Sequence, residues 1–426
     1  MFFFSIIQPM EKKLKIGIIG LGTVGTGVVK VLQDFPEIEI IGACVKNTSK
    51  KREVEVNFLT DDPFVIANHP EIDIVVEVAG GVDPMRDVLK TAIRNKKHIV
   101  TANKELLAKH GAELFDLANE YNVVILYEAA VAGGIPIISP IKNALRANKF
   151  VRVAGILNGT TNYILTKMEQ DQISYEKCLA RAQELGYAET DPTGDVEGFD
   201  TMYKIATLAN IVFGKRIDVN KIYREGITNI SDDDIKHAED LGYKIKLIGL
   251  AQRDGDSLDI RVHPMLIPVE NVISLIDNAL NAVQLEGTPV GQIMFTGPGA
   301  GEFPTASSVV GDILAIKSEI KTSDYILPLT RCNHHEYANQ LNILDTKSCY
   351  YISINAENRV GTIGLIGSVC AKNSINLSNI VQKGIKQDGT AQVIVVTEIA
   401  SERDMQNALT ELKEKGIVIN NLIRAM

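Results

Sequence analysis

The stretch KIGIIGLGTVGTGVVKVLQD, residues 15–34, decides the fold of the first third of the chain. An apolar run typical of a strand leads directly into GLGTVG, a GxGxxG pattern, and a helical pattern follows at once. Glycines at these positions allow a tight turn and a close approach of the backbone, while the helix N-terminus offers N–H groups to a pyrophosphate. The stretch therefore predicts a dinucleotide-binding loop. The residues that we expect to contact the dinucleotide are Gly20, Gly22, Thr23, Val24 and Gly25.

Apolar runs rich in β-branched residues recur over the next hundred residues and alternate with helical patterns. The runs are IEIIGACV (38–45), IDIVVEVAG (72–80), KHIVTA (97–102) and NVVILYEA (122–129). Such runs suit strands buried on both faces, and the helices between them suit right-handed crossovers of a parallel sheet. We therefore expect an α/β fold with a doubly wound, Rossmann-type dinucleotide-binding domain over residues 13–136, preceded by an N-terminal extension over residues 1–12.

The choice between the two nicotinamide dinucleotides depends on the end of the second strand. About 20 residues past the glycines, an NAD-type site carries Asp or Glu for the ribose hydroxyls. This chain reads CVKNTSKKR over residues 44–52, with Lys46 at the strand end and further cations behind it. Cations there favour a 2′-phosphate, so NADP is expected in preference to NAD. A solvated basic helix start is the alternative.

The composition indicates a globular protein without a nucleic-acid surface. The 426 residues include 44 lysines and arginines against 53 acidic residues, a net charge of -9. Nucleic-acid binding relies on basic neutralisation of phosphates, so no nucleic-acid partner is expected and a small molecule is favoured. No apolar run of about 20 residues occurs, so no membrane span is expected. The chain has five cysteines, an odd number, and they lie far apart in the sequence. This is typical of reduced thiols and favours a cytoplasmic location.

Beyond residue 136 the patterns predict an α+β domain. Long helical patterns, such as residues 199–213, accompany strands of alternating polarity, and DGD at residues 254–256 predicts a hairpin. We expect a catalytic and dimerisation domain over residues 137–340, of which residues 301–340 could pack back on the dinucleotide-binding domain.

The last part of the chain begins a new pattern. A polar linker, LTRCNHHEYANQLNILDTKS at residues 329–348, leads into the order strand, helix, strand, strand, helix, strand over residues 347–426. A βαββαβ unit of this size predicts an independent ferredoxin-like module.

A second stretch, ELGYAETDPTGDVEGFDTMYK at residues 184–204, gathers six acidic residues ahead of one lysine. Hydride transfer to or from a nicotinamide also moves a proton on or off the substrate oxygen, which needs a positioned acid or base. Lys204 is one candidate, and Lys104 is another because it follows a predicted strand at the sheet edge where ligands bind. On a helix Asp200 and Lys204 share a face, for which an ordinary surface ion pair is the alternative.

Several segments resemble the homoserine dehydrogenase family over residues 14 to about 340. They are ARAQELGYAETDPTGDVEGFDTMYK (180–204), NGTTNYIL (158–165), TANKELLAKHG (101–111), EAAVAGGIPII (128–138) and GPGAGEFPTASSVVGDI (297–313). The resemblance implies NAD(P)-dependent interconversion of L-homoserine and L-aspartate 4-semialdehyde. Without the resemblance, Asn158, Thr160 and Thr161 are expected only as turn and capping residues.

The resemblance also implies roles for individual residues. Lys204 matches the proton donor in aldehyde reduction, and Lys104 matches a residue between nicotinamide and substrate. The matches to substrate-binding carboxylates are Glu189 and Asp200, and those to cofactor-contacting glycines are Gly186 and Gly301. The matches to a sodium site are Glu128 and the carbonyls of Val131, Gly133 and Ile135. Glu184 and Glu197 are expected to be solvated.

The C-terminal βαββαβ module resembles ACT domains, which bind amino acids at subunit interfaces. Where typical members read DxPG, this chain reads AENRVGTIG over residues 356–364: Gly361 is kept, but Asn358 and Val360 replace the usual acid and proline. Inhibition by threonine is one hypothesis, and a structural or dimerising tail is the other. A homodimer or homotetramer is expected. The alternatives for the whole chain are another NADP-dependent reductase of a small amino-acid aldehyde and a non-catalytic amino-acid or dinucleotide sensor.

Overall fold

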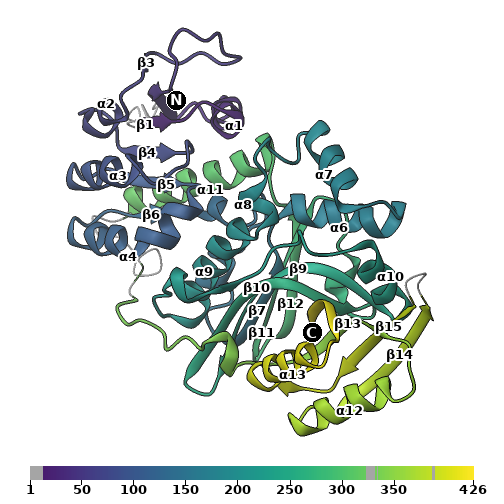
Figure 1. Cartoon of the computed structure of the whole chain (residues 1–426). Coiled ribbons are helices and arrows are strands. Elements are labelled where there is room, and N and C mark those ends of the chain that lie inside the picture. The colour runs from purple at the N-terminus through teal and green to yellow at the C-terminus, as the bar shows by residue number, and fades with distance from the viewer. Residues whose placement is uncertain (1–12, 323–331, 333, 386–388) are drawn as a thin grey trace, which may run out of the picture. The chain divides into compact units, whose positions relative to one another are not determined.

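The computed structural model describes residues 13–322, 332, 334–385 and 389–426 (Figure 1). The predicted extension over residues 1–12 lies outside the described residues, as do residues 329–331 and 333 of the predicted linker. The chain divides into two compact units, each of which is described by itself. The first unit comprises Met1–Ala147 and Pro298–His335, and the second comprises Asn148–Gly297 and Glu336–Met426.

The first unit is built on a parallel sheet. Its strands, in spatial order, are β3 (Leu59–Thr60), β2 (Ile38–Cys44), β1 (Leu14–Ile19), β4 (Ile74–Glu77), β5 (His98–Thr101) and β6 (Ile125–Leu126). Every neighbouring pair is parallel. The order 3-2-1-4-5-6 is that of a doubly wound sheet, whose ligand site lies at the carboxyl ends of the strands where the order reverses. This confirms the predicted Rossmann-type domain.

Helices cover both faces of this sheet (Figure 1). One face carries α2 (Pro63–Asn68), α3 (Met85–Arg94) and α4 (Lys104–Glu120), and the other carries α1 (Thr23–Leu32) and α11 (Glu302–Thr322). Two shorter helices, η1 (Glu128–Ala130) and α5 (Ile138–Lys142), follow β6. Val309 and Ile313 of α11 are fully buried in one core with Val28 of α1. Residues 298–322 therefore pack in the first unit, although about 150 residues of the second unit precede them.

The second unit contains one long, mostly antiparallel sheet. In spatial order its strands are β12 (Gly291–Pro298), β11 (Leu280–Thr288), β7 (Lys149–Ile156), β9 (Tyr243–Asp254), β10 (Ser257–Pro268), β17 (Val418–Ala425), β13 (Lys347–Glu357), β15 (Thr390–Thr397) and β14 (Leu377–Ile385). The short strands β8 (Tyr223–Arg224) and β16 (Ala400–Ser401) pair with β10 and β13. Ser257 pairs with Asp254 across a tight turn, which confirms the predicted hairpin.

Helices connect several strands of the second unit. They are α6 (Gly159–Asp171), α7 (Tyr175–Glu184), α8 (Thr193–Val196), α9 (Phe199–Phe213) and α10 (Asp232–Asp240), with the short helices η2 (Val219–Lys221) and η3 (Val272–Leu275). Helix α9 matches its predicted range. Gly198 and Gly214 bound it with φ of 81° and 63°, the left-handed region that glycine adopts without steric cost.

The C-terminal module has the predicted βαββαβ order. It runs β13, α12 (Thr362–Lys372), β14, β15, α13 (Glu402–Glu414) and β17, and a short helix, η4 (Ile343–Asp345), precedes it. The module has a hydrophobic core of its own, but its sheet is not separate from that of the preceding domain. Strand β17 pairs in parallel with β10, Met265 opposite Arg424, so one sheet runs through the module and the preceding domain. An edge strand offers free N–H and C=O groups to any partner, and its sequence does not say which one it meets.

Candidate active site

The glycine loop of the first unit has the geometry of a dinucleotide site. Gly20 has a φ of 103°, and a Cβ on Gly25 would lie 1.9 Å from the Gly20 carbonyl oxygen, so both positions require glycine. Gly22 is the N-cap residue of α1, and no side chain bonds the N–H groups there. Apart from its chain neighbours, no atom of the described residues lies within 4 Å of the place where its Cβ would be, and the first turn of α1 carries no acidic residue. The start of α1 therefore has space beside Gly22 and no acidic side chain in its first turn, which suits an anion.

Four cations follow the second strand: Lys46, Lys50, Lys51 and Arg52. Lys46 is exposed immediately beyond β2. Arg52 folds back over the loop, with Nη2 donating to the Asn47 carbonyl at 2.7 Å and Nη1 to the Leu21 carbonyl at 3.5 Å. The Nε of Arg52 is buried without a hydrogen-bond partner. Because Leu21 belongs to the glycine loop, a guanidinium donor lies where the ribose of a bound dinucleotide is expected.

A buried carboxylate at the carboxyl end of β4 was not predicted from the sequence. Glu77 has no exposed surface, and its Oε1 accepts two backbone N–H groups of the following loop at 3.0 and 2.9 Å. Its Oε2 accepts the Thr101 hydroxyl at 2.7 Å, and burial raises the Glu77 pKa. The Thr101 oxygen in turn accepts the N–H of Asn103, which caps α4 just before Lys104. The sequence does place one acidic residue, Glu77, at the end of an otherwise apolar strand, and this pattern could have indicated a site residue.

The start of α11 lies against α1. Gly301, with a φ of 128°, precedes Glu302, whose carboxylate accepts the Lys30 ammonium at 2.8 Å. A Cβ on Gly27 would come within 2.8 Å of the Glu302 carbonyl oxygen. Gly301 is therefore held next to the helix that opens the dinucleotide loop.

The predicted sodium residues surround a tight turn after η1. Ala132 and Gly133 both have a φ of 56°, and the Gly133 carbonyl accepts the Ser308 hydroxyl at 2.7 Å. The Glu128 carboxylate accepts three backbone N–H groups from residues 137–139 at 2.6 to 2.7 Å. A carboxylate has about four acceptor sites, so one is left for a cation. Carbonyl and carboxylate oxygens of this kind fit a hard cation.

In the second unit, Lys204 and Asp200 form a buried ion pair on α9. They are 7% and 6% exposed, and Nζ donates to Asp200 Oδ2 at 2.7 Å and to the Leu157 carbonyl at 2.6 Å. The surface ion pair considered from the sequence does not describe them. A buried ammonium held by a carboxylate and a carbonyl is fixed in position, as a proton carrier must be.

Asn158 joins the two segments that carry the family resemblance. Its Nδ2 donates to Asp195 at 2.7 Å and to Asp200 at 2.9 Å, while its Oδ1 accepts the N–H of Thr161 as the cap of α6. Thr160 ties the same turn to the acidic loop, because its hydroxyl donates to the Tyr187 carbonyl at 2.6 Å. The sequence predicted a cap at Asn158 but not this bridge between two carboxylates.

The remaining predicted residues of the second unit lie on the acidic loop. Gly186, with a φ of 76°, and Glu189 are both exposed. The prediction of a solvated Glu197 is confirmed: its side chain is 38% exposed, although it lies 3.6 Å from Arg224 and accepts the Thr228 hydroxyl at 3.2 Å.

The C-terminal module contains a cavity of ≈ 140 Å³ at the start of α12. Its lining residues are Glu357, Asn358, Arg359, Gly361, Thr362, Ile363, Gly364, Gln382, Ala391 and Val393. Gly361 caps α12 with a φ of 92°, while Val360 points into solvent. Backbone N–H groups at this helix start can take a carboxylate.

Comparisons with known proteins agree over nearly the whole chain. Residues 20–128 match a family described as "Homoserine dehydrogenase, NAD binding domain", residues 136–314 match "Homoserine dehydrogenase", and residues 350–416 match "ACT domain". Within the described residues, no helix has both the length and the apolar character to cross a membrane.

Curated relatives and solved structures carry the same name. A homoserine dehydrogenase of Synechocystis is 41% identical, covering 97% of this chain and 99% of its own, and that of Bacillus subtilis is 39% identical, covering 96% of each. A crystal structure of a homoserine dehydrogenase from Thiobacillus denitrificans matches with a TM-score of 0.93 and 37% identity, over 97% of this chain and 98% of that one. A hyperthermophilic archaeal homoserine dehydrogenase in complex with NADPH matches with a TM-score of 0.63 and 25% identity, over 74% of this chain and all of that one.

Proposed function

The chain belongs to the homoserine dehydrogenase family, and from that premise we propose that Lys204 is the acid and base in its interconversion of L-homoserine and L-aspartate 4-semialdehyde. The observation that carries this proposal is the buried pair of Lys204 with Asp200, held at 2.7 Å. The nicotinamide cofactor, when bound, supplies or accepts the hydride. In aldehyde reduction the Lys204 ammonium donates its proton to the oxygen as negative charge develops there, and in oxidation the neutral amine takes the proton back.

The other site residues are proposed in supporting roles. Asp200 and Glu189 hold the substrate ammonium, and Lys104 acts between nicotinamide and substrate. Asp200 would then contact both the substrate and the proton carrier, and its bond to Asn158 keeps it oriented. Gly186 and Gly301 are proposed to contact the cofactor together with the glycine loop. We propose a dinucleotide-binding domain over residues 13–136, a catalytic and dimerisation domain over residues 137–340, of which Pro298–His335 belong to the first unit, and an ACT-like regulatory domain over residues 347–426.

We propose that NADP is preferred to NAD. The support is the group of cations past β2, since Lys46 is exposed and Arg52 contacts the Leu21 carbonyl of the glycine loop. Guanidinium groups bind phosphates with well-defined geometry, which makes Arg52 the stronger partner for a 2′-phosphate.

We propose a sodium ion at the turn after η1, held by carbonyls of Val131, Gly133 and Ile135 with Glu128. The left-handed pair at residues 132 and 133 turns successive carbonyls in different directions, and one acceptor site of Glu128 remains. The ion would brace the turn that packs against the start of α11. Raising sodium chloride at constant ionic strength should raise the melting temperature more than choline chloride does; equal effects would count against the site.

We propose that an amino acid, threonine being the first to test, binds the cavity of the C-terminal module and lowers turnover. The start of α12 offers backbone donors for a carboxylate, and Glu357 and Asn358 lie beside them for an ammonium. Calorimetric titration with threonine, repeated on Gly361→Val, tests this directly. The absence of heat with the unaltered chain would refute it.

We propose further that the enzyme works in the cytoplasm as a homodimer or homotetramer. Val272 and Leu275 of η3 and Leu280 at the start of β11 expose 49%, 67% and 43% of their surfaces, and a second copy would cover such exposed apolar side chains. Light scattering after size exclusion would give the mass of the particle, and a monomer would contradict the proposal.

The function is tested by following reduced nicotinamide with homoserine and either NADP+ or NAD+. The expected result is turnover with homoserine, with NADP+ the better cofactor. Turnover would also exclude a non-catalytic sensor. No turnover with either cofactor, in a chain that binds NADPH, would overturn the proposal.

A further inference from the structure

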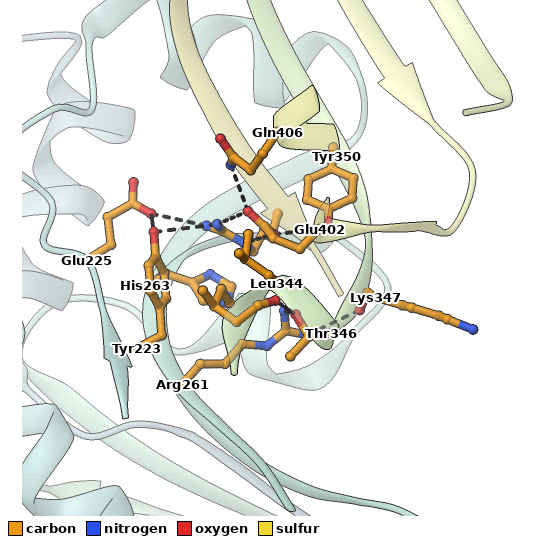
Figure 2. A network of polar contacts seen from close by, with 12 residues as sticks. Tyr223, Glu225, Arg261, His263, Leu344, Thr346, Lys347, Tyr350, Glu402 and Gln406 are labelled. Carbon is orange, nitrogen blue, oxygen red and sulfur yellow. Dashed lines mark hydrogen bonds and ion pairs between the residues drawn. The ribbon is translucent and has the colours of Figure 1, made fainter. Parts of the chain in front are cut away.

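A buried ion pair anchors the last strand of the C-terminal module (Figure 2). Arg424 of β17 donates through Nε and Nη2 to both oxygens of Glu402 at 2.8 and 2.6 Å, and the two side chains are 3% and 1% exposed. Tyr350 and Gln406 donate to the same carboxylate at 3.0 and 2.9 Å. A bidentate pair with these additional donors holds the guanidinium in one orientation.

The same guanidinium also reaches out of the module (Figure 2). Arg424 Nη1 donates to Glu225 Oε2 at 3.1 Å, and Nη2 lies 3.4 Å from the Tyr223 hydroxyl. The Tyr223 hydroxyl donates to Glu225 at 3.0 Å, and the guanidinium lies 4.9 Å from the centre of the Tyr223 ring. Tyr223 and Glu225 belong to the preceding domain, so Arg424 joins the two.

A second set of contacts joins the C-terminal module to the preceding domain. Asn421, three residues before Arg424, donates to the Asn229 carbonyl at 3.1 Å and to Asp234 Oδ2 at 2.9 Å. Tyr351 of β13 donates to the other oxygen of Asp234 at 3.1 Å. Residues 223–234, which we call the coupling segment, are therefore held by the C-terminal module at both ends.

The middle of the coupling segment packs on the acidic loop. The N–H of Ile227 donates to the Val196 carbonyl at 2.8 Å, and the Thr228 hydroxyl donates to Glu197 at 3.2 Å. A Cβ on Gly226 would lie 2.3 Å from the Val196 carbonyl oxygen, so the two backbones touch. Residues 196–198 thus have little freedom to move apart from the coupling segment.

This part of the acidic loop lies between two residues of the candidate site. Residues 196–198 separate Asp195 from the first turn of α9, and Asn158 holds both Asp195 and Asp200. The Arg224 guanidinium also packs 3.6 Å from the centre of the Phe199 ring, the first residue of α9. The coupling segment therefore supports the turn that sets where Asp200 and Lys204 lie.

We propose that Arg424 and Asn421 are positioning residues for the reaction, which act on Asp200 and Lys204 through the coupling segment. The inference rests on the proposed roles of Asp200 and Lys204. The C-terminal module is on this account a part of the catalytic structure, and its last strand is needed for full turnover even without an effector. Misplacement of reacting groups by about 1 Å can cost about 100-fold in rate, which sets the scale of the expected effects.

The test removes the contacts at the coupling segment and leaves the Arg424–Glu402 pair intact. Glu225→Ala should lower kcat with homoserine about 10-fold, and Glu225→Ala with Asn421→Ala about 100-fold, while the KM for NADP+ stays unchanged. Glu225→Gln keeps an acceptor for the guanidinium and should recover most of the turnover. Tyr223→Phe, which removes one hydroxyl, provides a milder variant if Glu225→Ala folds poorly, and should lower kcat less.

Lys383→Ala is the matched control. Lys383 pairs with Asp240 at 2.6 Å, which also joins the module to the preceding domain but lies outside the coupling segment. This variant should keep the turnover of the unaltered chain. Amide exchange over residues 196–204 should accelerate in Glu225→Ala and not in Lys383→Ala.

Unchanged kcat in the double variant, equal losses in Lys383→Ala, or unchanged exchange over residues 196–204 would each overturn the inference. If the unaltered chain fails to oxidise homoserine, the proposed function fails. The exchange comparison still decides whether the coupling exists, because it does not depend on activity.

Discussion

Replacing Lys204 by methionine separates its catalytic role from its structural one. Methionine keeps an unbranched chain of similar length but removes the ammonium that contacts Asp200 Oδ2 at 2.7 Å and the Leu157 carbonyl at 2.6 Å. The loss of general acid and base catalysis should lower turnover by about two to four orders of magnitude, or about 3 to 5 kcal/mol of barrier. NADPH binding should survive, because the glycine loop belongs to the other unit.

The single substitution should also destabilise the second unit. It leaves the Asp200 carboxylate buried without its cation, and breaking a buried pair in this way costs about 3 to 5 kcal/mol. Removing both charges, in Asp200→Asn with Lys204→Met, should restore most of the stability, since replacing a buried pair together is often neutral. Asn158 can still donate to the amide oxygen of the new side chain.

The double variant therefore makes the experiment decisive. Urea unfolding gives the stability of each variant, and the absorbance of reduced nicotinamide gives turnover with homoserine. Lys177→Met, an exposed lysine on α7, is the control for a lost surface charge and should behave like the unaltered chain. If turnover returns with stability in the double variant, or if Lys204→Met keeps more than about a tenth of the activity, Lys204 is not the proton carrier.

Three further predictions address the first unit. Gly25→Ala should weaken NADPH binding at least about 100-fold in a fluorescence titration, because its Cβ would lie 1.9 Å from the Gly20 carbonyl oxygen; normal binding would show that the loop does not hold the cofactor. Burial lowers the pKa of His98 to about 4, and its Nδ1 accepts a backbone N–H at 3.1 Å. In the unfolded chain this histidine takes up a proton near pH 6.5, so the free energy of unfolding should fall by up to about 3 kcal/mol between pH 6.5 and pH 4. Urea unfolding of His98→Gln should show a smaller fall over the same pH range. An equal fall would contradict the prediction. Combined Lys46→Ala and Arg52→Ala should raise the KM for NADP+ about 10-fold or more and leave that for NAD+ nearly unchanged, whereas parallel changes would remove the basis for NADP preference.

The parts of the fold that repeat locally could be predicted from the sequence. The GxGxxG motif between a strand and a helix predicted the Rossmann-type domain of the first unit. The tight turn, the close approach of the backbone and the start of the helix are all local requirements. The range of α9 and the shared face of Asp200 and Lys204 followed from helical periodicity. The βαββαβ order followed from alternation and turns.

Contacts between distant segments could not be predicted in the same way. Periodicity places Asp200 beside Lys204 but does not say that the face is covered, so their burial, the Asn158 bridge and the support of Glu197 by Thr228 were missed. The pairing of β17 with β10 was missed for the same reason, since its two strands lie about 150 residues apart in sequence. Packing of this kind depends on shape and on which polar groups remain unpaired, and a single sequence does not contain that information.

The central claim is hydride transfer between the nicotinamide and carbon 4 of the four-carbon substrate, assisted by Lys204. The most direct test incubates the protein with L-aspartate 4-semialdehyde and NADPH deuterated at carbon 4 of the nicotinamide, using each stereoisomer of the label in turn. Mass and NMR spectra should show homoserine with one deuterium at carbon 4 from one of the two isomers, and Lys204→Met should form it at least about 100-fold more slowly. Homoserine without deuterium from either isomer, or no homoserine at all, would contradict the account.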